Sequence, residues 1–274
     1  MKIAIGIVAH GTAHEAPEEL RGSFHVELLC NASCDSRTAW RGFAANHNLL
    51  MERLRDSDWY IALNPDVRVT ADALRSLVQQ AEAAELTVAA PLFESPWGLS
   101  GEPHASLPSP GTWLRETAST HARVDSERPV GASEWVTGAC MAIDRRRAPD
   151  LRFDERYFLY FEDADLCLRV KRAGGRVGVV RRVTVHHGSG WSPADPLRRR
   201  RGIEFARSAL LFADVAGYSR AAMRSAGLSR FGSRILVGRT PQARAAARAI
   251  ARGFLTPADP GLSELARDFN RGVG

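Results

Sequence analysis

The first 90 residues alternate short apolar runs with segments of helical periodicity, and this alternation constrains the fold more than any other feature of the chain. The segments at 39–55 and 70–85 space their apolar side chains as a helix does, and Thr70 is expected to cap the second. Strands that alternate with helices are typical of an α/β sheet with parallel crossovers. The expected strands are residues 2–9, 24–30, 59–63 and 86–90.

The remainder of the chain is less regular until its last third. A long stretch at 91–132 is rich in Gly, Pro and Ser, and such stretches usually carry function or cover a site. The end of the chain, from about residue 196, is helical in pattern and rich in Arg and Ala. Between these lie an expected strand at 134–144 broken by Gly138, a helix at 162–171 closed by Gly174-Gly175, and two short strands at 176–180 and 183–187.

Charge is distributed unevenly along the 274 residues. The chain carries +6 overall, but from Asp195 onward 15 arginines face six acids, a net charge of +9. The first 194 residues therefore carry −3. An acidic body with a basic C-terminal region does not predict nucleic-acid binding by the whole fold. With 45% hydrophobic and 25% charged residues, the composition excludes collagen-like, coiled-coil and disordered chains.

Cysteine usage and the N-terminus predict a cytoplasmic protein. The four cysteines, Cys30, Cys34, Cys140 and Cys167, form no C-x-x-C pair and are expected to be reduced thiols. The N-terminal apolar run is expected to be a first strand and not a signal peptide. No stretch approaches the roughly 18 apolar residues that a transmembrane helix needs.

Asn64-Pro65-Asp66 follows the expected strand at 59–63. In open α/β sheets ligands bind beyond the carboxyl ends of the strands, so Asp66 is positioned for a ligand or a metal ion. Considered alone, the tripeptide is better explained as an ordinary Asx-Pro turn.

Three acids, Glu162, Asp163 and Asp165, occupy the first turn of the expected helix at 162–171. The helix dipole favours acids there, which is a sufficient structural explanation for one of them. Three crowded carboxylates repel one another more than capping requires, and this repulsion raises the pKa of at least one of them. A carboxyl with a raised pKa can serve as a general base, so we favour the functional interpretation.

Two histidines, His186 and His187, end an expected strand before a Gly/Ser turn. A single histidine in such a place is more often structural. If His186 converges with Asp66, the pair suits a divalent cation. Mg²⁺ or Mn²⁺ would need few protein ligands if substrate phosphates completed the coordination shell, so a diphosphate substrate is expected.

Several segments, in this order, resemble family-2 glycosyltransferases of GT-A fold, and most closely their rhamnosyltransferase-like branch. The resemblance runs from about residue 24 to 192 and implies a GT-A catalytic domain over 1–192. Its nucleotide half would be about 1–90, its acceptor half about 91–192, and a helical basic region would follow at 193–274. The segments are NAS at 31–33, GFAANHN at 42–48, LNPDV at 63–67, WVTGACMAIDR at 135–145, FDERYFLYFEDADLCLR at 153–169 and VHHGSG at 185–190.

The resemblance implies a metal site at the donor diphosphate. Asp66 corresponds to the family's carboxylate that holds Mg²⁺ or Mn²⁺, and Asn64 stands at the first position of that motif. His186 aligns with the histidine on the metal side, and the adjacent His187 stays an alternative.

The resemblance also implies the residues of the transfer step. Asp163 would be the general base on the acceptor hydroxyl, and Glu162 its acidic partner. The donor- and nucleotide-binding positions would be Ala9, Asn31, Gly42, Asn46, Asn64, Asp66, Gly138 and Ala139.

The acceptor is expected over the stretch at 91–132, where Trp97 and Trp113 could stack on a sugar, with Asp165 nearby. Packing of these side chains onto the body explains them equally well. A glycan, a lipid-linked sugar and a small molecule are all open as acceptors.

Two departures from the family pattern leave the nucleotide open. Cys30 stands where the family usually has an acid before Asn-Ala-Ser, and a loop at 10–23 replaces the first helix. Both changes fall in the half of the pocket that would contact the base.

The basic C-terminal region has two interpretations. Residues 242–255 could lie on an anionic membrane at the inner face of the cell membrane. They could equally form a solvated helix or a subunit contact such as a homodimer, and we favour this second interpretation because alanine buries little area.

The sequence therefore predicts an inverting glycosyltransferase that uses a TDP- or UDP-sugar, with rhamnose-like donors among the candidates. Two alternatives remain: a GT-A-like binding subunit without catalysis, and a sugar nucleotidyltransferase. Release of a nucleoside diphosphate and not pyrophosphate would exclude the latter.

Overall fold

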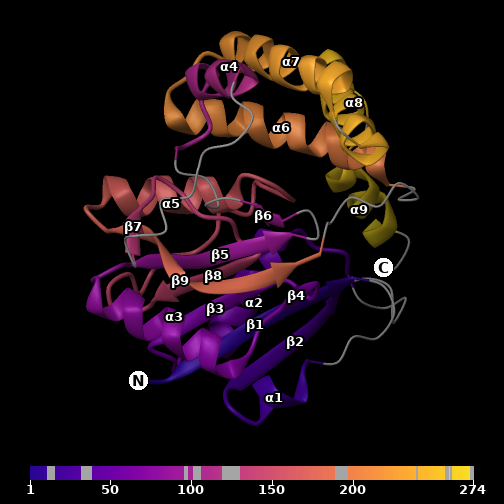
Figure 1. Cartoon of the computed structure of the whole chain (residues 1–274). Coiled ribbons are helices and arrows are strands. Elements are labelled where there is room, and N and C mark those ends of the chain that lie inside the picture. The colour runs from indigo at the N-terminus through magenta and orange to yellow at the C-terminus, as the bar shows by residue number, and fades with distance from the viewer. Residues whose placement is uncertain are drawn as a thin grey trace.

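The structure, a computed structural model, contains a central sheet with helices on both faces and a helical layer beyond one edge (Figure 1). It describes residues 1–10, 16–31, 39–95, 98–100, 106–118, 130–188, 197–238, 240–256, 259 and 261–271. Within these ranges nine strands form one sheet, in the order β2-β1-β3-β8-β5-β9-β4, with β6 paired to β5 and β7 to β9. The strands are β1 Ile3–His10, β2 His25–Asn31, β3 Trp59–Leu63, β4 Val67–Arg68, β5 Val88–Ser95, β6 Gly98–Ser100, β7 Val130–Ala132, β8 Cys140–Asp144 and β9 Val177–His187.

The α/β fold class is confirmed, and the sheet is mixed. Parallel pairing joins β1 to β2 and β3, and joins β5 to β9. Strand β8 is antiparallel to both of its neighbours, β3 and β5. The expectation of a mostly parallel sheet is therefore correct only for these two groups of strands, because a short buried apolar run carries no signal for its direction.

Helices cover both faces of the sheet. Helix α3 packs with Ile5, Ile61 and Val185 in one core, while α2 and α5 pack with Tyr60 and Met141 in a second core on the other face. The Thr70 hydroxyl accepts a hydrogen bond from the Ala73 amide at 3.2 Å, which confirms the expected cap of α3. The helices of this part are α1 Glu18–Arg21, α2 Phe43–Arg53, α3 Ala71–Ala83, α4 Pro110–Ala118 and α5 Glu162–Arg172.

Several expected elements differ from those observed. The two strands expected at 176–180 and 183–187 form one strand, β9, whose pairing with β5 shifts register between Pro91 and Leu92. The loop expected at 10–23 contains the one-turn helix α1. The stretch expected to be irregular at 91–132 contains the end of β5, the strands β6 and β7, and helix α4.

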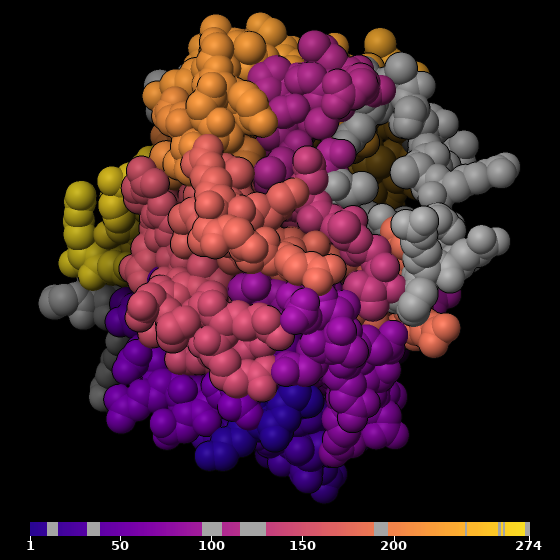
Figure 2. Space-filling view, turned by 90° about the vertical axis from the view of Figure 1, so that its left-hand side faces the viewer, coloured from indigo at the N-terminus to yellow at the C-terminus, as the bar shows by residue number. Residues whose placement is uncertain are grey.

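The C-terminal part is helical, as expected, and packs above the sheet. Figure 2 shows α4, in magenta, seated among these orange helices. A third core joins Trp113 of α4 and Phe161, at the start of α5, to Phe212 and Phe254. The helices are α6 Arg198–Ala216, α7 Arg220–Val237, α8 Pro241–Leu255 and α9 Leu262–Arg271.

The apolar face of α8 lies inside the protein. Ala247, Ile250 and Phe254 are all buried in the third core. Helices α6 and α7 therefore cover this face, and contact of the basic C-terminal region with a membrane stays a prediction. In the part of the chain that the structure describes, we find no helix with the length and apolar character needed to cross a bilayer.

Candidate active site

A pocket of about 480 Å³ opens where β3 and β9 end, between the sheet and the helical layer. Half of the residues predicted to be functional meet there. Asn64 and Asp66 come from the turn after β3, His187 from the end of β9, and Glu162 and Asp163 from the first turn of α5. The wall also includes Phe43, Trp113, Thr137, Gly138, Ala139, Tyr160, Phe161, Arg201, Phe205, Arg230, Phe231 and Arg234.

Asp66 lies beside His187 and not beside His186. The distance from His187 Nε2 to Asp66 Oδ1 is 3.4 Å, whereas His186 Nδ1 lies 3.2 Å from a carboxylate oxygen of Glu94. The short strand β4 produces this placement, since it pairs Val67, the residue after Asp66, with His187. The assignment of His186 to the site is therefore corrected to His187, the alternative that the sequence had left open.

The Asp66–His187 pair fits a divalent cation in its chemistry and spacing. Two ligand atoms, each about 2.1 Å from one octahedral ion, lie about 3 Å apart, close to the observed 3.4 Å. Among the described residues no group of three or more His, Cys, Asp or Glu side chains could hold a metal. A cation at this pair would therefore need further ligands from water or from a phosphate-bearing substrate.

Asp163 is held rigidly and is almost fully buried. Its Oδ2 accepts a hydrogen bond from the Gly138 amide at 3.0 Å, and its Oδ1 accepts one from the Ala164 amide at 2.8 Å. The Thr137 hydroxyl also bonds this carboxyl. Burial raises the pKa of Asp163 to about 6, and these hydrogen bonds oppose the rise. The carboxylate is thus ionised at neutral pH, yet remains basic enough to accept a proton.

Glu162 is the other member of the acid pair, and its negative charge is less well stabilised than that of Asp163. It is 4% exposed, and its Oε2 has no hydrogen-bond partner among the described residues. Burial raises its pKa well above 4.5, and the charge of Asp163 raises it further. The turn that presents both acids is itself strained, because Tyr160 (φ 71°) and Phe161 (φ 66°) adopt left-handed conformations that cost side-chain-bearing residues free energy.

The residues predicted to bind the acceptor lie in different places. Trp113 lines the pocket and is 5% exposed, packed against Phe161 and Phe231. Asp165 faces away from the pocket, where its carboxylate lies 2.7 Å from Arg169 Nε, so its assignment to the acceptor site is corrected to a buried ion pair. Trp97 and Cys34 lie outside the described residues.

The residues expected around the nucleotide form a second cluster near the carboxyl ends of β1 and β2. Asn31 bonds the backbone of Arg41 at both polar groups: its Nδ2 donates to the carbonyl at 2.6 Å and its Oδ1 accepts from the amide at 2.9 Å. Asn46 Nδ2 donates to the same carbonyl at 3.1 Å. Gly42 is pressed so closely to the Phe158 carbonyl that a Cβ would lie 2.3 Å from it. Ala9 is buried opposite Cys30 in the β1–β2 ladder.

Sequence reasoning missed the wall that the helical layer supplies. Arg201 comes from α6, and Arg230 and Arg234 from α7. Arg230 lies 5.8 Å from the ring centroids of both Trp113 and Phe231. The C-terminal region contains many arginines, and the sequence does not distinguish these three from arginines that face solvent. For His187 a signal did exist, because Val183 and Val185 are buried and side chains two apart share a face of a strand.

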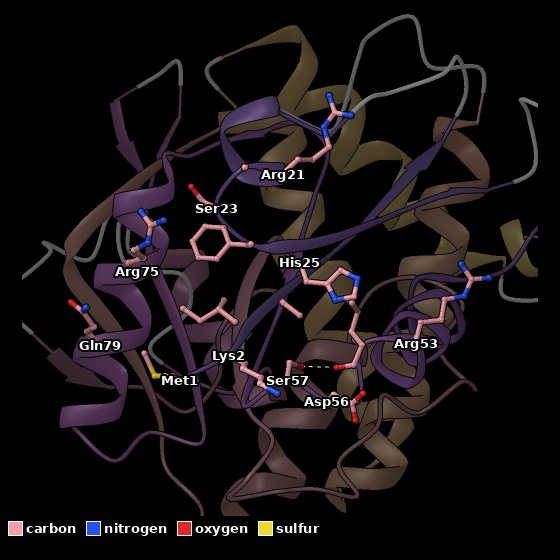
Figure 3. Close-up of a pocket in the computed structure, with 15 residues that line it drawn as sticks. Met1, Lys2, Arg21, Ser23, His25, Arg53, Asp56, Ser57, Arg75 and Gln79 are labelled. Carbon is pink, nitrogen blue, oxygen red and sulfur yellow. Dashed lines mark hydrogen bonds between the residues drawn. The ribbon is translucent and has the colours of Figure 1, made fainter.

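A larger hollow of about 760 Å³ lies at the opposite end of the strands, where β1 and β2 begin (Figure 3). Lys2, Arg21, Arg53 and Arg75 are spread around its rim, and Asp56 is the one acid among its lining residues. Because ligands of α/β sheets bind at the carboxyl ends of the strands, we do not place the reaction there.

No family model matches the chain, but named relatives do. An N-acetylglucosaminyl-diphospho-decaprenol L-rhamnosyltransferase of Mycobacterium tuberculosis is 33% identical over 158 residues, which is 51% of this chain and 50% of that protein. The low-salt glycan biosynthesis hexosyltransferase Agl10 of Haloferax volcanii is 24% identical over 164 residues, 57% of this chain and 51% of that protein. The chain spans about half the length of these curated relatives.

Solved glycosyltransferases share the fold. The mannosyltransferase PcManGT of Pyrobaculum calidifontis, solved with GDP-Man and Mn²⁺, superposes with a TM-score of 0.56 at 12% identity, covering 94% of this chain and 87% of that one. GalNAc-T7, solved with UDP, GalNAc and Mn²⁺, gives 0.50 at 13% identity, covering 93% and 56%.

The fold is therefore that of the GT-A glycosyltransferases. The chain is homologous to proteins named as glycosyltransferases, and the name of the mycobacterial relative agrees with the resemblance to rhamnosyltransferases.

Proposed function

We propose that the chain is an inverting glycosyltransferase that moves a sugar from a nucleotide-diphosphate donor to an acceptor hydroxyl. The observation that carries the proposal is the convergence of Asp163 with the Asp66–His187 pair on one pocket. A base and a diphosphate-binding pair in one pocket can serve the two ends of a displacement at the anomeric carbon. The relationship to named glycosyltransferases supports the same reaction.

Asp163 would accept the proton of the acceptor hydroxyl as that oxygen attacks the anomeric carbon. The transition state would resemble an oxocarbenium ion, as in glycoside hydrolysis. The Gly138 and Ala164 amides fix the carboxylate in one orientation, so little reorganisation is needed when the proton arrives. Burial and the charge of Asp163 raise the pKa of Glu162, so the pair takes up a proton at a higher pH than an exposed carboxyl would.

The donor diphosphate would leave toward Asp66 and His187. A divalent cation held by this pair would act as a Lewis acid that neutralises the charge growing on the leaving group. Asn64 holds the turn in place, because its amide donates to the Ala139 carbonyl at 2.8 Å and its carbonyl accepts from the Val67 amide at 3.1 Å. The nucleotide would extend toward the Asn31–Asn46 cluster.

The acceptor would occupy the aromatic side of the pocket, near Trp113 and the arginines. The name of the mycobacterial relative describes a diphosphate-linked lipid acceptor. Arg201, Arg230 and Arg234 suit such an acceptor here, since guanidinium groups bind phosphate oxygens in pairs. An Arg230→Gln variant should discriminate less than the native protein between phosphorylated and neutral acceptors. Arg224→Gln, on the exposed side of α7, should discriminate as well as the native protein does.

The decisive experiment substitutes the base. Asp163→Asn should lower transfer by about 10²–10⁴-fold, because the proton then has no acceptor, while nucleotide-sugar binding persists. Transfer is measured as release of nucleoside diphosphate, and binding by thermal shift against a panel of UDP-, TDP- and GDP-sugars with Mn²⁺. Equal loss of donor affinity would reassign Asp163 to binding, and release of pyrophosphate would replace the reaction by nucleotidyl transfer.

The two histidines provide a matched test of the metal site. Chelation should abolish transfer, and Mn²⁺ or Mg²⁺ should restore it. His187→Ala should raise the Mn²⁺ concentration for half-maximal activity about tenfold, whereas His186→Ala, one residue away on the other face, should leave it unchanged. Full activity in EDTA, or the opposite response of the two variants, would contradict this assignment.

A further inference from the structure

The turn that presents the acid pair is supported from two sides. On one side, the Ser208 hydroxyl of α6 donates a hydrogen bond to the Leu159 carbonyl at 2.8 Å. On the other, the Phe43 amide at the start of α2 donates to the Phe158 carbonyl at 2.8 Å, and the ring of Trp40 packs edge-on against that of Phe158 at 6.0 Å. Left-handed non-glycine residues, such as those that follow Phe158, persist only where the surroundings hold them.

The segment at 39–43 is in turn held by the C-terminal helix α9, about 230 residues further along the chain. Asn270 bonds both polar groups of the Trp40 backbone: its Oδ1 accepts from the amide at 2.7 Å, and its Nδ2 donates to the carbonyl at 3.0 Å. The neighbouring Phe269 packs edge-on against the Trp40 ring at 6.4 Å. The next residue, Arg41, is bonded in the same two-point manner by Asn31.

The other end of α9 is fixed to the helical layer. The amide and hydroxyl of Ser263 donate to Glu204 of α6 at 3.1 and 3.0 Å, and Glu264 pairs with Arg207. Glu204 is 4% exposed, so this attachment is buried. Helix α9 therefore connects α6 to the segment at 39–43. Both of these elements also contact the turn at 158–161, α6 through Ser208 and the segment through Phe43 and Trp40.

We propose that Asn270 is a positioning residue for the acid pair, acting through Trp40 and Phe158 on the turn that carries Glu162 and Asp163. Loss of the two hydrogen bonds to Trp40 frees the segment at 39–43, which loosens its contacts with Phe158. The carboxylate of Asp163 then loses its fixed orientation against Gly138. The statement about catalysis depends on the proposed function, but the mechanical coupling does not.

Hydrogen–deuterium exchange tests the coupling without any assay of transfer. Asn270→Ala should raise exchange of a peptide covering residues 156–166 at least severalfold. Asn270→Asp is nearly isosteric and should fold as the native chain does, but its carboxylate cannot donate to the Trp40 carbonyl, so it should give the same change. Arg271→Ala is the matched control, because Arg271 is exposed and pairs only at 3.7 Å with exposed Asp268 among the described residues. Unchanged exchange at 156–166 in both Asn270 variants would overturn the proposal.

The pH profile of transfer separates positioning from general destabilisation. In the native protein the rate should fall below about pH 6, where Asp163 becomes protonated. In Asn270→Asp, kcat should drop about tenfold while the acid limb moves to lower pH, because a loosened turn admits water to the carboxyl. The groups that face Asp163 stay the same in both proteins: Glu162, Cys167, the Thr137 hydroxyl, and across the pocket Asp66, His187, Arg201, Arg230 and Arg234.

A reduced kcat with an unmoved acid limb would assign Asn270 a structural role alone and overturn the proposal. If native protein transfers no sugar, the proposed function fails while the exchange experiment still decides the coupling.

Discussion

At the residue scale, the acid pair shows how two adjacent carboxyls can have different environments. Asp163 is bonded by two amides and a hydroxyl, whereas Glu162 Oε2 is buried and finds no partner in the part of the chain that the structure describes. The pKa of Glu162 in the folded protein lies well above its ordinary value of 4.5, so the ionised form is disfavoured by folding. Its contribution to stability is full below pH 4.5 and is lost as the pH rises toward the raised pKa.

We therefore expect Glu162→Gln to stabilise the protein near neutral pH. The amide carries no charge to bury, so the Tm at pH 8 should rise by about 2–4 °C for each kcal/mol recovered. The gain should shrink as the pH falls toward 4.5 and vanish below it, where Glu162 is protonated in both states. Thermal melts of both proteins between pH 4 and 8 measure this difference; a gain independent of pH would contradict it.

Individual site residues could be predicted from the sequence where a motif fixes its own geometry. Asp66 and Asp163 follow from the end of a strand and the start of a helix, and both line the pocket. The choice between His186 and His187 depends on which face of β9 meets Asp66, and that is decided by pairing with β4. A two-residue strand has too few side chains to be read from the sequence.

At the element scale, α6 and α8 cross at a contact between backbones. A Cβ at Gly202 would lie 2.3 Å from the Ala249 carbonyl, and one at Gly253 would lie 2.5 Å from the Gly202 carbonyl oxygen. These two glycines thus permit the close approach of α6, which carries Arg201, and α8, and both helices contribute side chains to the third core. An arginine- and alanine-rich pattern predicts such helices but not their partners.

Gly202→Ala should separate these two helices. The added methyl group must displace backbone, which costs about 1–3 kcal/mol and should lower transfer activity, since Arg201 moves with it. Gly232→Ala on α7 is the matched control, because a Cβ there has nothing within 4 Å among the described residues, and alanine favours a helix by up to about 1 kcal/mol. Urea unfolding of both variants gives the comparison; equal stability would refute the crossing.

At the scale of the whole molecule, the helical layer and the sheet share one core. Trp113 and Phe161 lie among residues of α6, α7 and α8, and Phe254 approaches Trp113 with ring centroids 6.0 Å apart. Division into a catalytic domain over 1–192 and a helical region over 193–274 remains a proposal about function. In terms of packing, the pocket is walled by both parts.

The shared core predicts one cooperative unfolding transition. Tryptophan fluorescence and helical circular dichroism should melt together in the native protein. Phe254→Ala should destabilise the folded protein by about 3–5 kcal/mol. The Tm should fall by the same amount whether it is followed by fluorescence or by circular dichroism. Two separate transitions, or a shift in the helical signal alone, would show that the layers unfold independently.

The strands and helices near the site could be predicted because their periods are local. Their arrangement could not, since the direction of β8 and the docking of α9 on Trp40 depend on partners far away in the chain. The partners of α8 could not be predicted for the same reason, because an apolar stripe indicates burial but does not identify the element that buries it.

The reversed direction of β8 has an evolutionary consequence. It brings Gly138 and Ala139 to the rim where β3 delivers Asn64, and the Asn64 amide donates a hydrogen bond to the Ala139 carbonyl just beyond the paired strands. Inserting or deleting a single residue in either strand would slide the Gly138 segment, which bonds Asp163, past the turn that carries Asp66 by one step of about 3.3 Å and invert every side chain beyond it. Descendants of this gene can therefore lengthen their outer loops freely, while these two strands must keep their residue count.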